Sequence, residues 1–185
     1  GENYLQEGLV KIKALANLPI EWHFIGPIQS NKTKPIAESF SWVHGIDREK
    51  IAKRLSDARP DTLPPLQVCV QVNVSGEITK SGVDPEKAAE LAAYVSELPR
   101  LQLRGLMAVP ELTAVTALQR EQFQQLRELF EKLNQQGFNL DTLSMGMSED
   151  LENAVSEGAT MVRIGTAIFG PRRYAIPEEL GSRQP

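Results

Sequence analysis

Two segments near the end of the chain carry residue types that could hold a phosphate. They are Ser144-Met145-Gly146-Met147-Ser148-Glu149-Asp150 and Arg163-Ile164-Gly165-Thr166-Ala167-Ile168-Phe169-Gly170. Gly165 has no side chain to keep a ligand from the backbone. The N–H groups of Gly165 and Thr166 could therefore point at a phosphate at the start of a helical turn. A glycine-containing strand end with Thr166 as a helix cap explains the same pattern equally well.

Ser148 and Arg163 each allow two interpretations. The Ser148 hydroxyl could contact a ligand, or it could cap a helix whose first turn contains Glu149 and Asp150, acids that suit a helix N-terminus but repel a phosphate. Arg163 falls on a predicted strand, where a permanent cation needs a partner. That partner is either a neighbouring acid or a ligand.

The remaining reactive side chains show no recognisable constellation. His23 and His44 lie on predicted strands, with no cysteine, histidine or carboxylate spacing typical of zinc. Lys32, Lys34 and Lys80 follow predicted strands, where solvated charge is the ordinary role. Neither a Gly-x-Ser-x-Gly elbow nor a Gly-x-Gly-x-x-Gly after a strand occurs.

Short apolar runs that alternate with amphipathic stretches must position these segments. Strands are predicted at residues 20–25, 42–46, 66–74, 101–109, 140–147 and 161–164, and helices at 4–16, 34–40, 47–58, 84–98 and 148–157. A further long helix is predicted after Pro110, with an apolar stripe from Leu118 to Leu133 and Gly137 at its end. This alternation favours a parallel sheet with crossover helices. The count is six or seven strands, depending on whether Gly1-Glu2-Asn3 ends another one. An eight-stranded α/β barrel without its first unit fits this count, and the phosphate segments then follow its last two strands. An open doubly wound sheet is the alternative.

The composition is typical of one globular domain. The chain has 185 residues with 41% hydrophobic residues and a net charge of −4, which argues against a nucleic-acid surface, and no apolar run approaches the ~20 residues of a membrane span. Its single cysteine, Cys69, is interpreted as a core residue and fits a reducing, cytoplasmic location. We expect residues 1–172 to form the domain and residues 173–185 an irregular tail. A start at Gly1 rather than Met suggests a fragment.

Several segments together resemble the pyridoxal 5'-phosphate (PLP) homeostasis family, whose fold matches the N-terminal barrel of alanine racemase. The resemblance is carried by Gly1-Glu2-Asn3-Tyr4, His23-Phe24-Ile25-Gly26-Pro27-Ile28-Gln29-Ser30-Asn31-Lys32, Lys80-Ser81-Gly82, Arg104-Gly105-Leu106-Met107 and the two phosphate segments. It implies a (β/α)8 barrel of the TIM type with PLP as cofactor.

The resemblance also implies roles for individual residues. Ser148, Gly165 and Thr166 hold the cofactor phosphate, and Arg163 faces the pyridine nitrogen. Asn3 and Met147 line the pocket, although Asn3 could instead cap the first helix. Met107 is expected near the ring, and Lys80 near the entrance.

In this family a lysine on the first barrel strand holds PLP as an imine, upstream of the segment that matches Gly1-Glu2-Asn3. That strand is not in the sequence, and the role is not transferred to Lys32, which follows a later strand. The chain as printed is therefore expected to bind PLP weakly. The resemblance implies a role in intracellular PLP homeostasis without turnover, with protein partners unknown. An amino-acid racemase and a phosphosugar-metabolising barrel enzyme are the alternatives.

Overall fold

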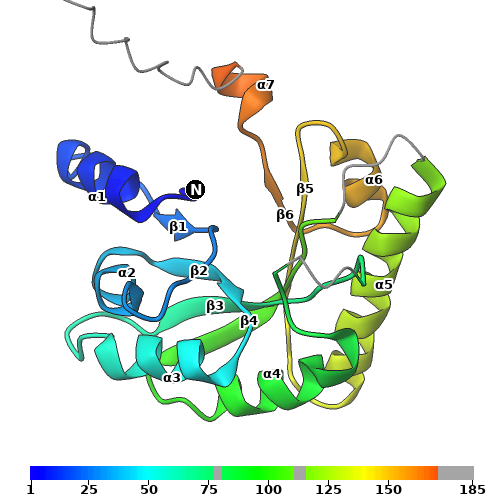
Figure 1. Cartoon of the computed structure of the whole chain (residues 1–185), viewed down its shortest axis with the longest axis horizontal. Helices are drawn as coiled ribbons and strands as arrows, with labels where there is room; N and C mark the ends of the chain where they lie inside the picture. The colour runs from blue at the N-terminus through cyan, green and yellow to red at the C-terminus, as the bar shows by residue number, and fades with distance from the viewer. Residues whose placement is uncertain (77–80, 111–115, 171–185) are drawn as a thin grey trace, which may run out of the picture.

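The computed structural model describes residues 1–76, 81–110 and 116–170 (Figure 1). It contains one sheet of six parallel strands whose spatial order follows the sequence. The strands are β1 (His23–Phe24), β2 (Trp42–Ile46), β3 (Leu66–Gln71), β4 (Leu101–Met107), β5 (Thr142–Met147) and β6 (Met161–Arg163). Because a doubly wound sheet reverses its strand order at a switch point, this consecutive order indicates the barrel type of winding, and the doubly wound alternative is wrong.

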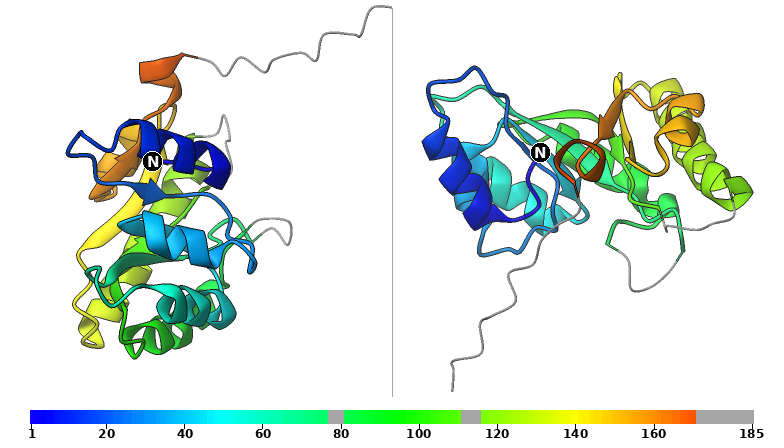
Figure 2. Two further views of the ribbon diagram at one scale, coloured as in Figure 1. Left: turned by 90° about the vertical axis from the view of Figure 1, so that its left-hand side faces the viewer. Right: turned by 90° about the horizontal axis from the view of Figure 1, so that it is seen from above.

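The first helix of the chain precedes β1 and the last follows β6, and the helices between them connect the strands along the outer side of the curved sheet, as Figures 1 and 2 show. They are α1 (Leu5–Ala14), α2 (Thr33–Ser39), α3 (Glu49–Ala58), the 3-10 turn η1 (Pro85–Lys87), α4 (Ala88–Ser96), α5 (Thr116–Gln135), α6 (Leu151–Ser156) and α7 (Thr166–Phe169). The predicted start at Asp84-Pro85 is confirmed, because the Asp84 carboxylate accepts a hydrogen bond from the Glu86 N–H.

The main core lies between the sheet and these helices. On β3, Val68 and Val70 belong to this core, whereas Cys69 between them packs with Trp42 and Met107 in a second, smaller cluster. Because successive strand residues point to opposite faces, the second cluster marks the inner face of the curved sheet. Burial raises the pKa of the Cys69 thiol to about 12, as expected for an inert core cysteine.

The two edges of the sheet lie at β1 and β6. Glu2 extends the β1 edge by a parallel bridge to Phe24, with the Ile25 N–H donating to the Glu2 carbonyl at 2.9 Å. Among the described residues, no pairing joins this edge to β6. The described part is thus an open, curved parallel sheet.

Several elements are shorter than the sequence predicts. Residues 20–22 lie outside β1, and α6 begins at Leu151 rather than at Ser148. The turn between β5 and α6 is closed instead by the Asp150 carboxylate, which accepts a hydrogen bond from the Met147 N–H. The expected tail, residues 173–185, lies outside the described residues.

Candidate functional site

The two phosphate-type segments meet at the carboxyl ends of β5 and β6. Ser148 lies in the turn after β5, and its hydroxyl oxygen accepts a hydrogen bond from the Ala167 N–H at 3.3 Å. Ala167 lies in α7, directly after Gly165 and Thr166. Ser148 therefore does not cap α6, where Asp150 takes the N-cap position, and its hydroxyl faces the second segment instead.

Gly165 is required neither by its backbone conformation nor by packing. Its φ of −115° lies in a region open to any residue. Among the described residues, no atom lies within 4 Å of the position that a Cβ on Gly165 would take. The residue thus leaves open space beside the peptide, as close approach of a ligand requires.

The N–H groups of Gly165 and Thr166 are available to a ligand. Within the described ranges, no backbone or side-chain acceptor binds either group, whereas the N–H groups of Ile168 and Phe169 bond to the Gly165 carbonyl. Both residues are exposed. Two free donors beside open space and a hydroxyl form an arrangement that suits a phosphate.

Arg163 lies on β6, beside Met147 of β5 in the register of the sheet. Its Nη1 donates to the Ser144 carbonyl and to the Ser144 hydroxyl, both at 3.0 Å, and its Nη2 donates to the Ala108 carbonyl at 2.8 Å. Burial lowers its pKa, although an arginine remains charged. No carboxylate pairs with it in the described part of the chain, so the ion-pair interpretation is wrong.

A free donor on Arg163 remains for a ligand. No described residue accepts a hydrogen bond from Arg163 Nε. Among the described residues, Gln122 Oε1 is the one fully buried side-chain atom that lacks a hydrogen-bond partner, so Nε is not fully buried. Protein oxygens therefore hold the guanidinium at Nη1 and Nη2, and its Nε–H has no acceptor among the described residues. A donor-only group of this kind suits a ring nitrogen with a lone pair.

Two histidines that the sequence left without a role lie behind Arg163. His44 is buried on β2 and contacts the Ser144 hydroxyl at 2.8 Å, and its other ring nitrogen lies 3.0 Å from His23. The His23 ring stacks on Trp42, with 5.2 Å between ring centroids. Burial lowers the pKa of His44 to about 3, so its ring is neutral at ordinary pH. The sequence places His44 on the same strand face as Trp42, but it contains no signal that links His44 to Arg163.

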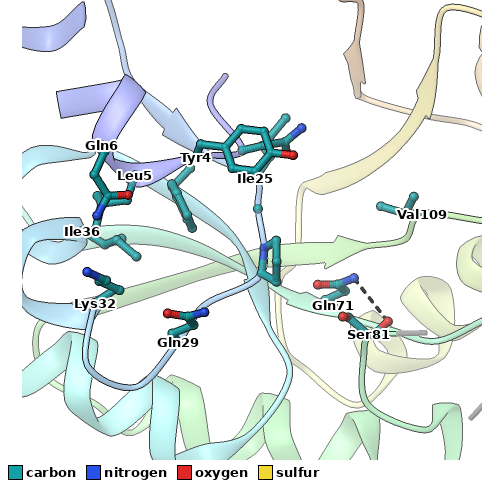
Figure 3. A pocket seen from close by; sticks show the side chains of 14 residues that line it. Tyr4, Leu5, Gln6, Ile25, Gln29, Lys32, Ile36, Gln71, Ser81 and Val109 are labelled. Atoms are coloured by element: carbon teal, nitrogen blue, oxygen red, sulfur yellow. Dashed lines mark hydrogen bonds between the residues drawn. The ribbon is translucent and has the colours of Figure 1, made fainter. Parts of the chain in front are cut away.

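A cavity of about 590 Å³ opens at the carboxyl ends of β1, β3 and β4 (Figure 3). Its lining includes Asn3, Gln29, Lys32, Gln71 and Val109. Among the predicted site residues, Asn3 lines it, whereas Met147, Ser148, Arg163, Gly165 and Thr166 do not. The cavity and the phosphate-type segments thus occupy different parts of the same end of the sheet.

Asn3 and the lysines can also be placed. The N-cap of α1 is Tyr4, without a side-chain cap, so Asn3 does not have the capping role. Lys32 is half-buried at the cavity, and Lys34 lies in α2 beside Glu38, with 3.9 Å between the charged groups. Lys80 lies outside the described residues. Met107 is buried on the inner face.

The described residues show neither a metal site nor a membrane span. They contain no cluster of three or more histidine, cysteine, aspartate or glutamate side chains that could hold a metal ion. None of the helices in these ranges is long and apolar enough to cross a membrane.

Comparison with known proteins gives consistent matches. The family "Alanine racemase, N-terminal domain" matches residues 1–173. The chain is 64% identical over 177 residues to the pyridoxal phosphate homeostasis protein of Pseudomonas aeruginosa, covering 96% of this chain and 76% of that protein. It is 53% identical over 178 residues to the protein of that name from Escherichia coli, covering 95% and 76%.

Solved structures agree with these matches. PipY of Synechococcus elongatus with PLP bound superposes with a TM-score of 0.84 at 37% identity, over 92% of this chain and 80% of PipY. An alanine racemase from Clostridium difficile superposes with a TM-score of 0.76 at 15% identity, over 93% of this chain and 47% of the racemase. This second likeness concerns the fold alone.

Proposed function

Since the chain belongs to the pyridoxal phosphate homeostasis protein family, we propose that it binds PLP and serves intracellular PLP homeostasis without turnover. The observation that carries the proposal is the pair of free N–H groups at Gly165 and Thr166, beside open space and the Ser148 hydroxyl. Binding of PLP to PipY, a relative at 37% identity, supports the same ligand.

In this proposal the phosphate lies against Gly165, Thr166 and Ser148. Among the described residues, backbone N–H groups and the Ser148 hydroxyl supply the contacts to the anion. The one buried acid of the β5–α6 turn, Asp150, is turned to the Met147 N–H, which reduces its repulsion of the anion.

The ring lies toward Arg163. When bound, PLP supplies a reactive aldehyde and an electron-withdrawing ring. Arg163 can only donate, so it favours a pyridine nitrogen that keeps its lone pair, and such a ring withdraws electrons less strongly. This property suits storage and release and disfavours transamination. Asn3 and Met147 are proposed to line the remaining walls.

We further propose that residues 1–172 are the PLP-binding domain and that the open sheet is part of a (β/α)8 barrel lacking its first unit. The consecutive strand order and the extra strand position at Glu2 support this architecture. A cytoplasmic location is proposed from the single buried cysteine.

The test is equilibrium dialysis of the chain against PLP. Gly165→Leu places a side chain in open space, so the fold should tolerate it while the phosphate is displaced. Ala93→Leu, an exposed change on α4, is the matched control. We expect Gly165→Leu to weaken retention about tenfold or more, equivalent to at least about 1.4 kcal/mol, and the control to leave it unchanged. Equal retention by the unmodified chain, Gly165→Leu and Ala93→Leu would contradict the assignment. A racemisation assay tests the absence of turnover.

A further inference from the structure

A continuous line of hydrogen-bonded side chains crosses the inner face of the sheet behind Arg163. Arg163 Nη1 lies 3.0 Å from the Ser144 hydroxyl, which lies 2.8 Å from His44 Nδ1. His44 Nε2 lies 3.0 Å from His23 Nδ1, and His23 Nε2 lies 3.1 Å from the Glu21 carboxylate. The line joins a cation on β6 to an exposed carboxylate that precedes β1.

The chemistry at its two ends fixes the direction of every hydrogen bond between them. The Glu21 carboxylate only accepts, so a neutral His23 carries its proton on Nε2 and accepts at Nδ1. His44 must then donate from Nε2, which leaves its Nδ1 as an acceptor. The Ser144 hydroxyl therefore donates to His44 and accepts from the guanidinium, which has donors only. All donors point from Arg163 toward Glu21.

We propose that Ser144 and His44 are positioning residues for Arg163, with His44 held as the neutral tautomer that is protonated on Nε2. The inference rests on the proposed function, in which Arg163 contacts the ligand. It adds the residues that set where the guanidinium lies and which of its donors stay free.

The acceptor on His44 is what makes the Ser144 hydroxyl usable by Arg163. A hydroxyl rotates freely, and with its hydrogen turned toward the guanidinium it would repel the cation instead of accepting from it. His44 Nδ1 draws that hydrogen away. Together with the carbonyls of Ser144 and Ala108, the hydroxyl oxygen occupies Nη1 and Nη2 and leaves Nε without an acceptor among the described residues.

Neutrality of His44 is the second requirement. A protonated ring would donate at Nδ1 and would place a second cation beside the guanidinium. Burial at 1% exposure opposes this charge, and His23 and Arg163 oppose it further, in agreement with the lowered pKa of His44.

The tautomer is measured on the ligand-free chain by 15N NMR of the imidazole rings. The chain contains two histidines, so a single His23→Asn variant assigns both. We expect a pyridine-like Nδ1 and a pyrrole-like Nε2 in His44 at neutral pH. A pyrrole-like Nδ1 in His44 would overturn the proposal, because the Ser144 hydroxyl would then lose its acceptor.

The positioning role is tested by three variants. His44→Asn keeps an oxygen that can accept from Ser144, His44→Leu removes it, and Cys69→Ala is the control on the same inner face without a part in the line. The readout is the set of slowly exchanging Nη protons of Arg163, identified by their loss in Arg163→Lys. We expect these signals in the unmodified chain, in His44→Asn and in the control. In His44→Leu we expect faster exchange of the Nη1 protons, while the Nη2 bond to the Ala108 carbonyl remains. Should His44→Leu not fold, Ser144→Ala takes its place with the same expectation.

Retention of PLP separates this inference from the proposed function. We expect His44→Leu to weaken retention about tenfold, with partial recovery in His44→Asn. If the unmodified protein does not retain PLP, the proposed function fails, and the ligand-free signals still decide the inference. Unchanged Arg163 signals in both His44→Leu and Ser144→Ala would overturn it.

Discussion

Lowering the pH should reduce the free energy of unfolding through His44, at pH values above those at which carboxylates titrate. The pKa of His44 falls from an ordinary 6.5 to about 3 because the ring is buried, with His23 and Arg163 as nearby cationic groups. Between pH 6.5 and pH 3, the His44 ring binds a proton in the unfolded chain but not in the folded chain. Stability is therefore complete above pH 6.5 and falls as the pH is lowered toward 3.

The magnitude follows from the two pKa values. Each pH unit inside this window costs about 1.4 kcal/mol, so the free energy of unfolding should fall by about 2 kcal/mol between pH 7 and pH 5. His44 is 1% exposed, so solvent screening does not reduce this value. His23, whose pKa burial also lowers, acts in the same direction. Asp141 and Glu157 also have lowered pKa values, but they reduce the free energy of unfolding only at lower pH, where carboxylates take up protons.

Urea unfolding at both pH values tests the argument. The unmodified chain and Cys69→Ala should show the full loss. His44→Asn should be less stable at pH 7 but should lose about 2 kcal/mol less on acidification. The reasoning is refuted if His44→Asn keeps the pH dependence of the unmodified chain, or if that chain loses less than about 1 kcal/mol.

Two further predictions concern packing and the phosphate contact. Gly105→Ala places a Cβ 1.7 Å from the Thr142 carbonyl oxygen on the paired strand. We therefore expect the free energy of unfolding, measured in urea, to fall by about 3 kcal/mol or more. A smaller loss would mean that the two strands move apart at little cost. Ser148→Ala removes the acceptor of the Ala167 N–H at a half-buried position. The free energy of unfolding should therefore change by less than about 1 kcal/mol, while PLP retention falls about tenfold. Equal retention would show that Ser148 does not contact the phosphate.

The parallel winding could be predicted from the sequence because it depends on local patterns. The same patterns placed the two candidate segments at neighbouring strand ends, where the structure brings them together, and their binding of phosphate stays a prediction. Alternating apolar runs specify strands and crossover helices, and Arg163, Gly165 and Thr166 are nearly consecutive. Element ends were less predictable. The strand predicted at residues 66–74 is too long, because apolar residues continue past Gln71, where β3 ends. The start of α6 depends on whether Ser148 or Asp150 closes the turn before it, and the structure uses Asp150.

The support behind Arg163 could not be predicted from the sequence. His44 and Ser144 lie 100 positions apart and meet because of the curvature and the register of β2 and β5 across the inner face. Each residue has an ordinary explanation in isolation, as a strand histidine and a strand serine. Their joint role is visible only once the sheet brings their side chains together.

The central claim is tested most directly by a crystal structure of the protein with PLP bound. The account predicts that the phosphate lies within hydrogen-bonding distance of the Gly165 and Thr166 N–H groups and the Ser148 hydroxyl, with the pyridine nitrogen facing Arg163. A phosphate seated instead in the cavity between Lys32 and Gln71, away from Gly165, would contradict it.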